Sequence, residues 1–514
     1  MATKILLIAP PFNPERFLEK DFFSKGKQAP LFPFGIAYIA SYLLIYGHGY
    51  EVEILDIYAR QLTKEEVITE LKKTEYDFTG ISALVSQYEY VKWLSEAIKS
   101  IHNVPVILGN GLGTASHKLV LEKNSSIDVC VRGEGEITFK EVIENIDNLE
   151  NVLGISYRDD NGKIVITPDR PVQKNIDEFP WPAYELFDMS LYIDTKFYET
   201  GIFNVRDKYL GKRILPFITS RGCPYNCNFC GKIIPTVRLR SIRDIVKEIE
   251  YLKDNYHIDG IHFIDELVVI NKKRAIALSE ALKSMNLLWD CQGRVNTVDY
   301  ETLKIMKESG CVAIGYGVES GSQKILDNMN KRTTVEQVEE AMKAAKKADL
   351  DVKVQLIFGY PGENFKSLEE TVNIFKKVGH PGRGFSFICP LPGTTLYNYA
   401  LNTGLIQDEE EFLYKIQESF DHNIPVINFT DFDFDDLVPL MKKCELKMLM
   451  IYGRYLFLHP LELIKLSKKY DFSGIFRKLL IRGIPYIMPY IKHSINIKRV
   501  FKRKAIDYKK TNYK

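Results

Sequence analysis

Three of the eight cysteines lie close together in one short segment of the chain. Cys223, Cys227 and Cys230 form a C-x3-C-x2-C pattern, and the remaining five are scattered. Three thiolates on one loop can hold three irons of a 4Fe-4S cube. Because no fourth cysteine lies nearby, the fourth iron would stay open to a chelating ligand. The scattered cysteines are expected to be small buried apolar residues: Cys130, Cys291, Cys311, Cys389 and Cys444.

The main alternative for these residues is a zinc site. Structural zinc usually has four ligands, often supplied as two C-x2-C pairs, and the sequence contains no second pair. The nearest histidines, His117 and His257, are distant in sequence from the triplet. The spacing therefore favours an iron–sulfur cluster over zinc. A chain of 514 residues with scattered cysteines does not fit a disulfide framework either.

Two blocks of alternating strand and helix patterns must position this loop. In the first block, apolar runs of strand length alternate with segments of helical periodicity. This alternation predicts an α/β fold with a doubly wound parallel sheet over residues 1–145. Ligands of such sheets bind beyond the carboxyl ends of the strands. Those ends carry Asp56, Ser86, Gly109, Gly111, Gly133 and Glu134.

The rest of the chain divides into three further parts. Residues 146–210 are less regular and contain a proline on each side of Trp181, which is typical of a connector. A second βα alternation over residues 211–420 contains the cysteine triplet. Residues 421–514 are predicted to form a helical region that ends in a basic tail.

The triplet, with Phe229 directly before its last cysteine, resembles the signature of the radical S-adenosylmethionine (SAM) superfamily. Five further segments match motifs of that family in the family's order: 260–266, 289–294, 317–322, 355–363 and 390–397. The resemblance implies a partial (β/α)6 barrel. It also implies that the open iron chelates SAM through the methionyl amine and carboxylate. One electron from the cluster would then release a 5′-deoxyadenosyl radical.

The resemblance also implies a set of residues that contact SAM. Phe229 would cover the adenine, and Asp265 and Glu266 end the strand that meets the SAM amino group. Arg294 offers a fork for a carboxylate, while Glu319 and Ser320 belong to the motif that contacts the ribose or carboxylate. The alternative for each charged residue is a solvated or structural ion pair, which is common in βα barrels.

The first block resembles the cobalamin-binding domain that precedes the radical SAM domain in one large subclass. The loops around Gly109, Gly111, Gly133 and Glu134 carry the match, and Asp56 and Ser86 occupy the neighbouring strand ends. Many cobalamin domains contain D-x-H-x-x-G, whose histidine replaces the lower axial ligand. The corresponding loop, 56–60, has neither that histidine nor the glycine. Cobalamin would then bind without a protein histidine. The alternative is a degenerate domain that only packs on the barrel.

Three functions follow from these patterns. The first is cobalamin-dependent methylation of an unactivated carbon by a radical SAM enzyme. The second is a radical SAM cyclase, coupling or rearrangement enzyme that acts on a lipid or tetrapyrrole. The third is a non-catalytic corrinoid or iron–sulfur binding protein. An enzyme of either kind needs a small-molecule or lipid substrate and an external electron donor such as a ferredoxin or flavodoxin.

Charge and hydropathy bear on location and partners. The net charge of +2 gives no general case for nucleic acid. The N-terminal segment lacks the features of a signal peptide, and no apolar run is long enough to span a bilayer, so a cytoplasmic enzyme is expected. From Asp471 onward, twelve Lys or Arg face two Asp. This composition predicts contact with an anionic membrane surface, and its alternative is a solvated basic end helix.

Overall fold

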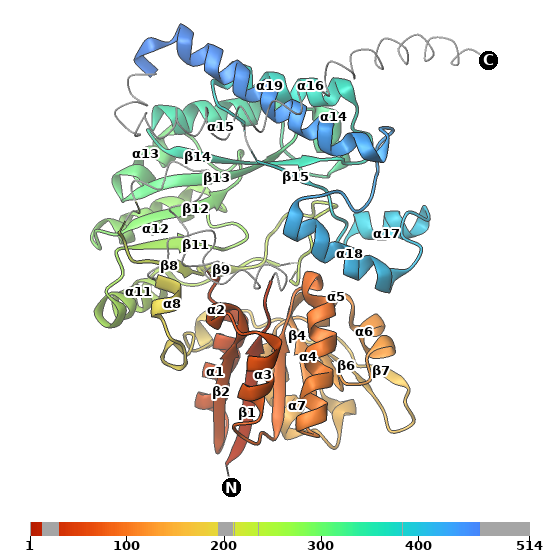
Figure 1. Cartoon of the computed structure of the whole chain (residues 1–514). Coiled ribbons are helices and arrows are strands. Elements are labelled where there is room, and N and C mark those ends of the chain that lie inside the picture. Colours follow the sequence, from red (N-terminus) through yellow and green to blue (C-terminus); the bar gives the residue numbers. More distant parts are fainter. Residues whose placement is uncertain are drawn as a thin grey trace, which may run out of the picture.

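The chain forms two α/β units and a helical C-terminal region (Figure 1). The computed structural model describes residues 2–12, 30–193, 209, 211–234, 236–382 and 384–462. The predicted fold class is confirmed: a doubly wound sheet is followed by a partial barrel and then by helices.

The N-terminal sheet has its parallel strands in the order β2-β1-β3-β4-β5. Side chains alternate along β1: Ile5 and Leu7 pack against α1 and α7, whereas Leu6 and Ile8 pack against α3 and α4. Both faces are therefore covered, as expected for strands that are apolar throughout. The elements are β1 (Thr3–Ala9), α1 (Phe34–Tyr46), β2 (Tyr50–Asp56), α2 (Ile57–Arg60), α3 (Lys64–Leu71), β3 (Phe78–Ser82), α4 (Tyr88–Ile101), β4 (Val106–Gly109), α5 (Asn110–Ala115), α6 (His117–Lys123), β5 (Val129–Val131) and α7 (Gly135–Glu144).

The segment expected to be a connector, 146–210, extends this sheet. β6 (Ile155–Arg158) pairs antiparallel with β5, and β7 (Ile164–Ile166) pairs antiparallel with β6, which gives seven strands. The short strands are bounded by turns, and this irregular spacing concealed them in the sequence. After them the chain reaches α8 (Ser190–Ile193) and the second unit.

The second unit is an open half-barrel of six parallel strands in the order β8-β11-β12-β13-β14-β15. A short antiparallel pair, β9 (Ser220–Arg221) and β10 (Arg238–Leu239), brackets the cysteine segment. The barrel elements are β8 (Ile214–Phe217), α11 (Ile242–Tyr256), β11 (Gly260–Phe263), α12 (Lys272–Lys283), β12 (Leu288–Gly293), α13 (Tyr300–Glu308), β13 (Cys311–Glu319), α14 (Gln323–Asn328), α15 (Val335–Lys347), β14 (Asp351–Phe358), α16 (Phe365–Val378) and β15 (Phe385–Phe387).

The C-terminal helices connect the two units. α17 (Thr395–Asn402) and α18 (Glu409–His422) share a buried apolar cluster with α4 of the N-terminal unit. Glu410 accepts hydrogen bonds from the Tyr88 hydroxyl at 2.8 Å and from Lys92 Nζ at 3.0 Å. α19 (Leu437–Leu458) crosses the barrel over α16 (Figure 1).

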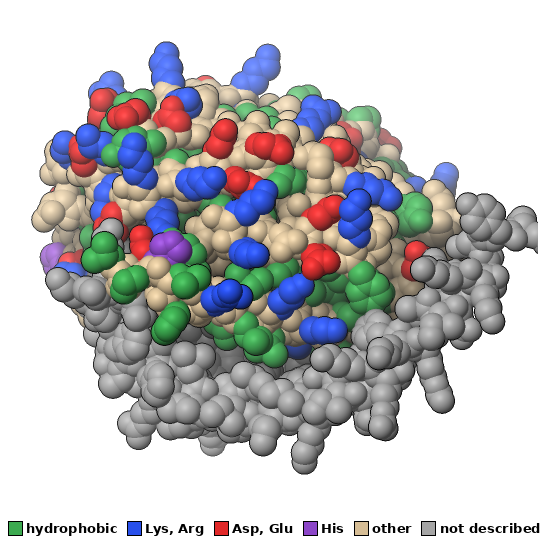
Figure 2. Space-filling view, turned by 90° about the horizontal axis from the view of Figure 1, so that it is seen from above, with side chains coloured by type: hydrophobic (Ala, Val, Ile, Leu, Met, Phe, Trp, Pro, Cys, Tyr) green, Lys and Arg blue, Asp and Glu red, His purple; other side chains and the backbone are tan. Residues whose placement is uncertain are grey.

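The surface over the barrel carries side chains of both charge signs. Figure 2 shows Lys and Arg interspersed with Asp and Glu across this face. Within the described residues, no helix is long and apolar enough to cross a membrane. The predicted basic tail, from residue 471 onward, lies outside the described residues.

Candidate functional site

The cysteine triplet lies on a loop that is fastened at many points. Lys232 Nζ donates to the backbone carbonyl of Cys223 at 3.2 Å and to Asn226 Oδ1 at 2.8 Å. Asn228 N donates to Met329 O at 3.0 Å, and the Asn228 carbonyl accepts from Leu396 N at 2.9 Å. The loop therefore has a fixed path over the barrel mouth, although it contains little regular structure.

The three thiols share one environment. Burial, together with the nearby Cys227, Glu266 and Cys223, raises the pKa of the Cys230 thiol to about 11. In the part of the chain that the structure describes, no three His, Cys, Asp or Glu side chains meet at a single-ion site. The fit therefore rests on the donor set: three soft sulfur ligands on one loop suit an iron–sulfur cluster, and binding iron would remove their protons.

Arg294, at the end of β12, lies directly beneath the cysteine loop. Its guanidinium group stacks 3.6 Å from the centroid of the Tyr225 ring, and Nη1 lies 3.9 Å from Cys227 Sγ. Nη2 donates to the backbone carbonyl of Lys331. This places a permanent positive charge beside the cysteines, where it could hold an anionic ligand.

Glu319 ends β13 and forms a buried ion pair. Its Oε1 accepts from Lys331 Nζ at 2.6 Å, and both side chains are about one-tenth exposed or less. A Cβ atom at Gly317 would lie 2.4 Å from Glu319 Oε1 and 2.9 Å from Lys331 Nζ, so only glycine leaves room for the pair. Lys331 was not predicted from the sequence, and no motif there singled it out.

The side chains of Phe229 and Ser320 lie in different surroundings. The Phe229 ring packs edge-on to Tyr360 at a centroid distance of 6.3 Å, and Lys331 Nζ lies 5.9 Å from its centroid. Phe229 therefore lies next to the Glu319–Lys331 ion pair, so one ligand could contact the ring and the ion pair together. The Ser320 hydroxyl lies 3.2 Å from Thr371 Oγ1 on α16 and accepts from Ser322 N at 3.1 Å. These contacts hold the strand end.

Asp265 has one engaged and one unpaired carboxylate oxygen. Oδ1 accepts from Thr219 N and Thr219 Oγ1 at 2.8 Å each, and from Ser220 Oγ at 2.5 Å. Oδ2 is buried without a hydrogen-bond partner among the described residues. Burial raises the pKa of this carboxyl against the effect of the three donors. A buried, unpaired oxygen at the barrel mouth suits a ligand that donates hydrogen bonds.

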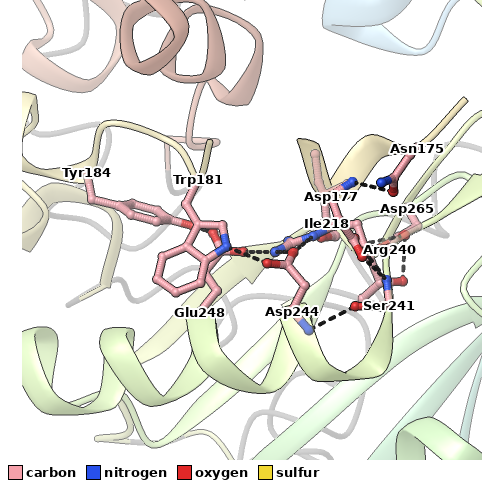
Figure 3. A network of polar contacts seen from close by, with 11 residues as sticks. Asn175, Asp177, Trp181, Tyr184, Ile218, Arg240, Ser241, Asp244, Glu248 and Asp265 are labelled. Atoms are coloured by element: carbon pink, nitrogen blue, oxygen red, sulfur yellow. Dashed lines mark hydrogen bonds and ion pairs between the residues drawn. The ribbon is translucent and has the colours of Figure 1, made fainter. Parts of the chain in front are cut away.

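A buried network fixes the strand end that holds Asp265 (Figure 3). Arg240 N donates to Thr219 O at 3.0 Å, and Arg240 Nη1 donates to Ile218 O at 2.9 Å. The same guanidinium pairs with Glu248 and with Asp244, whose other oxygen accepts from Trp181 Nε1 at 2.9 Å. The segment around Trp181 is thereby tied to the base of the cysteine loop.

A cavity of about 310 Å³ lies where the N-terminal sheet meets the barrel. Its apolar end lies among β1, β4, α1 and α7, and its other end reaches Ser220, Arg221, Asp265 and Glu266. Asp265 and Glu266 were predicted to contact SAM, and both line this wall. Burial raises the pKa of Glu266, and the positive charge of Lys232 only partly offsets this shift.

Three of the six predicted cobalamin residues line the cavity, namely Gly109, Gly133 and Glu134. A Cβ atom at Gly109 or Gly133 would meet no atom within 4 Å. Both positions therefore leave open space for a ligand. The wall also contains Asn110, which lies inside the matched Gly109–Gly111 loop, and Ser82, for which no role was predicted. Asn110 adopts a φ of +66°, and its Nδ2 donates to Ser82 Oγ at 3.1 Å.

Asp56, Ser86 and Gly111 lie outside the cavity wall. Asp56 is buried, caps α2 by accepting from Ala59 N at 2.8 Å, and accepts from the Tyr192 hydroxyl. Burial raises its pKa to about 6, against those hydrogen bonds. Because the chain turns into α2 directly after β2, the carboxylate is used as a helix cap instead of facing the cavity.

Polar side chains also line the inner wall of the half-barrel. Trp289 and Cys291 pack under the outer helices, so Asp290 between them points inward. Asp290 Oδ1 lies 2.7 Å from His262 Nδ1, and Asp290 Oδ2 accepts from the Tyr209 hydroxyl at 2.8 Å. His262 and Asp290 lie within the matched segments 260–266 and 289–294, but no role was predicted for either residue.

Two family models match the chain. The radical SAM superfamily model matches residues 217–375, and the B12 binding domain model matches residues 28–143. These ranges fall on the half-barrel and on the N-terminal sheet, and the first contains all three cysteines.

Two relatives and one solved structure are also similar to this chain. An uncharacterised methyltransferase of Pyrococcus horikoshii is 32% identical over 94% of this chain and 98% of its own length. An anaerobic magnesium-protoporphyrin IX monomethyl ester cyclase of Rubrivivax gelatinosus is 27% identical over 71% of this chain and 65% of its own length. Among solved structures, the radical SAM methyltransferase TsrM of Kitasatospora setae superposes with a TM-score of 0.62 at 17% identity, covering 79% of each chain.

Proposed function

This chain belongs to the radical SAM superfamily, in the subclass with an N-terminal cobalamin-binding domain, and from that premise we propose that it methylates an unactivated carbon atom. The observation that carries the proposal is the cavity between the two units. Strand-end residues of the N-terminal sheet form one wall, and Asp265, Glu266 and the base of the cysteine loop form the other. A methyl carrier in this cavity would lie beside the SAM site.

The donors that the chain presents fit these cofactors. Cys223, Cys227 and Cys230 would hold the cluster, and Arg294 would hold the SAM carboxylate. When bound, the cluster supplies one electron for the cleavage of SAM and cobalamin supplies a methyl carrier. We further propose that a ferredoxin or flavodoxin provides the electron.

Three acidic residues would accept hydrogen bonds from SAM. Asp265 Oδ2 and Glu266 would accept hydrogen bonds from SAM, since both are acceptors at the cavity wall. Lys331 fixes the position of Glu319 Oε1, which leaves the other Glu319 oxygen to meet ribose or ammonium donors. Among the described residues that line the cavity, none is a histidine. We therefore propose that cobalamin binds without a protein histidine ligand.

Methylation is preferred over ring closure on one observation. The relative that matches over almost its full length carries a methyltransferase name, whereas the cyclase matches over about two thirds of its length. The domain boundaries at residues 210 and 420 remain part of this proposal, whereas a boundary at 145 would divide the N-terminal sheet, which includes β6 and β7.

The proposal is tested with SAM labelled in its methyl group. The anaerobically reconstituted protein is incubated with a reductant and with either a polar small-molecule extract or a lipid extract. We expect 5′-deoxyadenosine and label in a product of one extract. Formation of 5′-deoxyadenosine with no labelled product in either extract would favour the cyclase alternative. Absence of 5′-deoxyadenosine in both would point to a non-catalytic binding protein.

We also propose that the basic tail contacts an anionic membrane. Twelve basic residues face two acidic ones from Asp471 onward, next to an apolar run at 481–491. Each basic residue near such a surface contributes about 1 kcal/mol before screening. We expect the full chain, and not a chain ending at residue 470, to sediment with phosphatidylserine vesicles. Part of that binding should persist in high salt because the apolar run inserts. Equal sedimentation of both chains would contradict the proposal.

A further inference from the structure

Four charged side chains connect the N-terminal unit to the two strands that bracket the cysteine loop. Glu134 and Glu136 come from the start of α7, and Arg221 and Arg238 come from β9 and β10. Glu134 Oε1 accepts from Arg221 Nη1 at 2.7 Å and from Arg238 Nη2 at 2.8 Å. Glu134 Oε2 accepts from Arg238 Nη1 at 2.7 Å, and Glu136 Oε1 lies 2.6 Å from Arg221 Nη2. We call these four residues the ion cluster.

The ion cluster is buried and electrically balanced. The side chains of Glu134, Glu136, Arg221 and Arg238 are 12%, 6%, 16% and 7% exposed. Burial acts to raise the pKa of Glu134, but Arg238 and Arg221 lower it below its usual value. The Arg221 guanidinium also lies 4.7 Å from the ring centroids of both Tyr38 and Phe179. Removing one member would leave a buried charge unpaired, so the four groups hold one arrangement.

One carboxylate thus holds both ends of the cysteine loop. Arg221 and Arg238 are directly paired residues of the β9–β10 ladder, and the three cysteines lie between them. The loop ends come so close that a Cβ atom at Gly222 would lie 2.2 Å from Thr236 O. A displacement of Glu134 must therefore move the base of the loop as a unit.

The same residues form part of the cavity wall. Glu134, Glu136, Arg221 and Gly222 all line it, next to Gly133 and Gly135. A group that enters the cavity therefore meets the side chains that hold the cysteine loop. Glu134 was predicted to bind cobalamin, but its two oxygens are already occupied by three hydrogen bonds from arginine. This occupancy favours a positioning role over a direct ligand role.

We propose that Glu134 is a positioning residue that couples the two ligand sites, so that a corrinoid in the cavity and SAM at the cysteine loop strengthen each other's binding. The inference rests on the proposed function, because it takes a corrinoid as the occupant of the cavity. Coupling between sites is reciprocal, and couplings in proteins usually amount to roughly 5–150-fold in affinity. We expect about tenfold here.

The test compares hydroxocobalamin affinity with and without saturating SAM in the full chain carrying its reconstituted cluster. In the wild type, SAM should lower the dissociation constant of hydroxocobalamin about tenfold. In Glu134→Gln the ratio should fall to about one, since a neutral amide cannot hold two guanidinium groups, while iron and sulfide contents stay at the wild-type level.

Two further variants separate coupling from mere stability. Glu141→Gln removes another carboxylate of α7, one that pairs with Arg170 inside the N-terminal unit, and it should keep the wild-type ratio. Arg238→Lys keeps the charge but loses the two-pronged contact, and it should give an intermediate ratio. If Glu134→Gln does not fold, Arg238→Lys decides the question.

The failures can be told apart. A wild-type ratio of one, or a wild-type ratio retained in Glu134→Gln, would overturn the coupling while leaving the proposed function intact. A wild-type protein that binds SAM but no hydroxocobalamin would overturn the cobalamin part of the proposed function, and the coupling with it.

Discussion

Replacing Cys223, Cys227 and Cys230 together by alanine will remove the iron–sulfur cluster and abolish the cleavage of SAM. These are the only closely spaced thiols in the sequence. The loss should exceed the roughly 10–100-fold that the removal of a supporting residue costs a metal site. Iron and sulfide analysis after anaerobic reconstitution, together with 5′-deoxyadenosine formation, measures it.

The control uses thiols that lie outside the triplet. Cys389 and Cys444 are far from the cysteine loop and from each other in the sequence. The double variant Cys389→Ala, Cys444→Ala should retain the cluster and the cleavage of SAM. A triple variant of the loop that still holds about four irons per chain would show that the cluster is bound elsewhere.

How much could be predicted from the sequence depended on how local each signal was. The cysteine loop is specified by residue type and spacing within eight positions, so Cys223, Cys227 and Cys230 could be named without a structure. The sheet and barrel strands were found because apolar runs and helical periodicity are also local. β6 and β7 were missed because three or four residues between turns give too little pattern.

Long-range contacts account for the site residues that could not be predicted from the sequence. Lys331 meets Glu319 only because α14 turns the chain back beneath β13, and Arg238 meets Glu134 across 104 positions. Asp56 looked like a cavity residue from its place at a strand end, but the helix that follows at once takes its carboxylate. Strand-end position predicts a neighbourhood, and local turns decide which side chain faces it.

The cavity itself can be closed by one substitution. Gly109 lines it, has an extended backbone with φ of −125° and ψ of −166°, and would meet no atom within 4 Å of an added Cβ. Gly109→Trp should therefore fold normally and place its indole where the corrinoid belongs. We expect the affinity for hydroxocobalamin to fall at least about a hundredfold, which corresponds to about 2.7 kcal/mol.

This variant separates the two halves of the reaction. The three cysteines, Arg294 and Glu319 do not line the cavity, and Gly109 belongs to its N-terminal wall and not to the barrel wall with Asp265 and Glu266. Gly109→Trp should therefore still produce 5′-deoxyadenosine while transfer of the labelled methyl group falls to background. Gly109→Ala should retain both, because one methyl group adds little bulk. Gly453→Trp, at an open position on α19 far from the cavity, controls for the added ring. The wild-type cob(II)alamin EPR spectrum should lack splitting from an axial nitrogen, and Gly109→Trp should lose the bound signal. Undiminished methyl transfer by Gly109→Trp would mean that this cavity does not hold the methyl carrier.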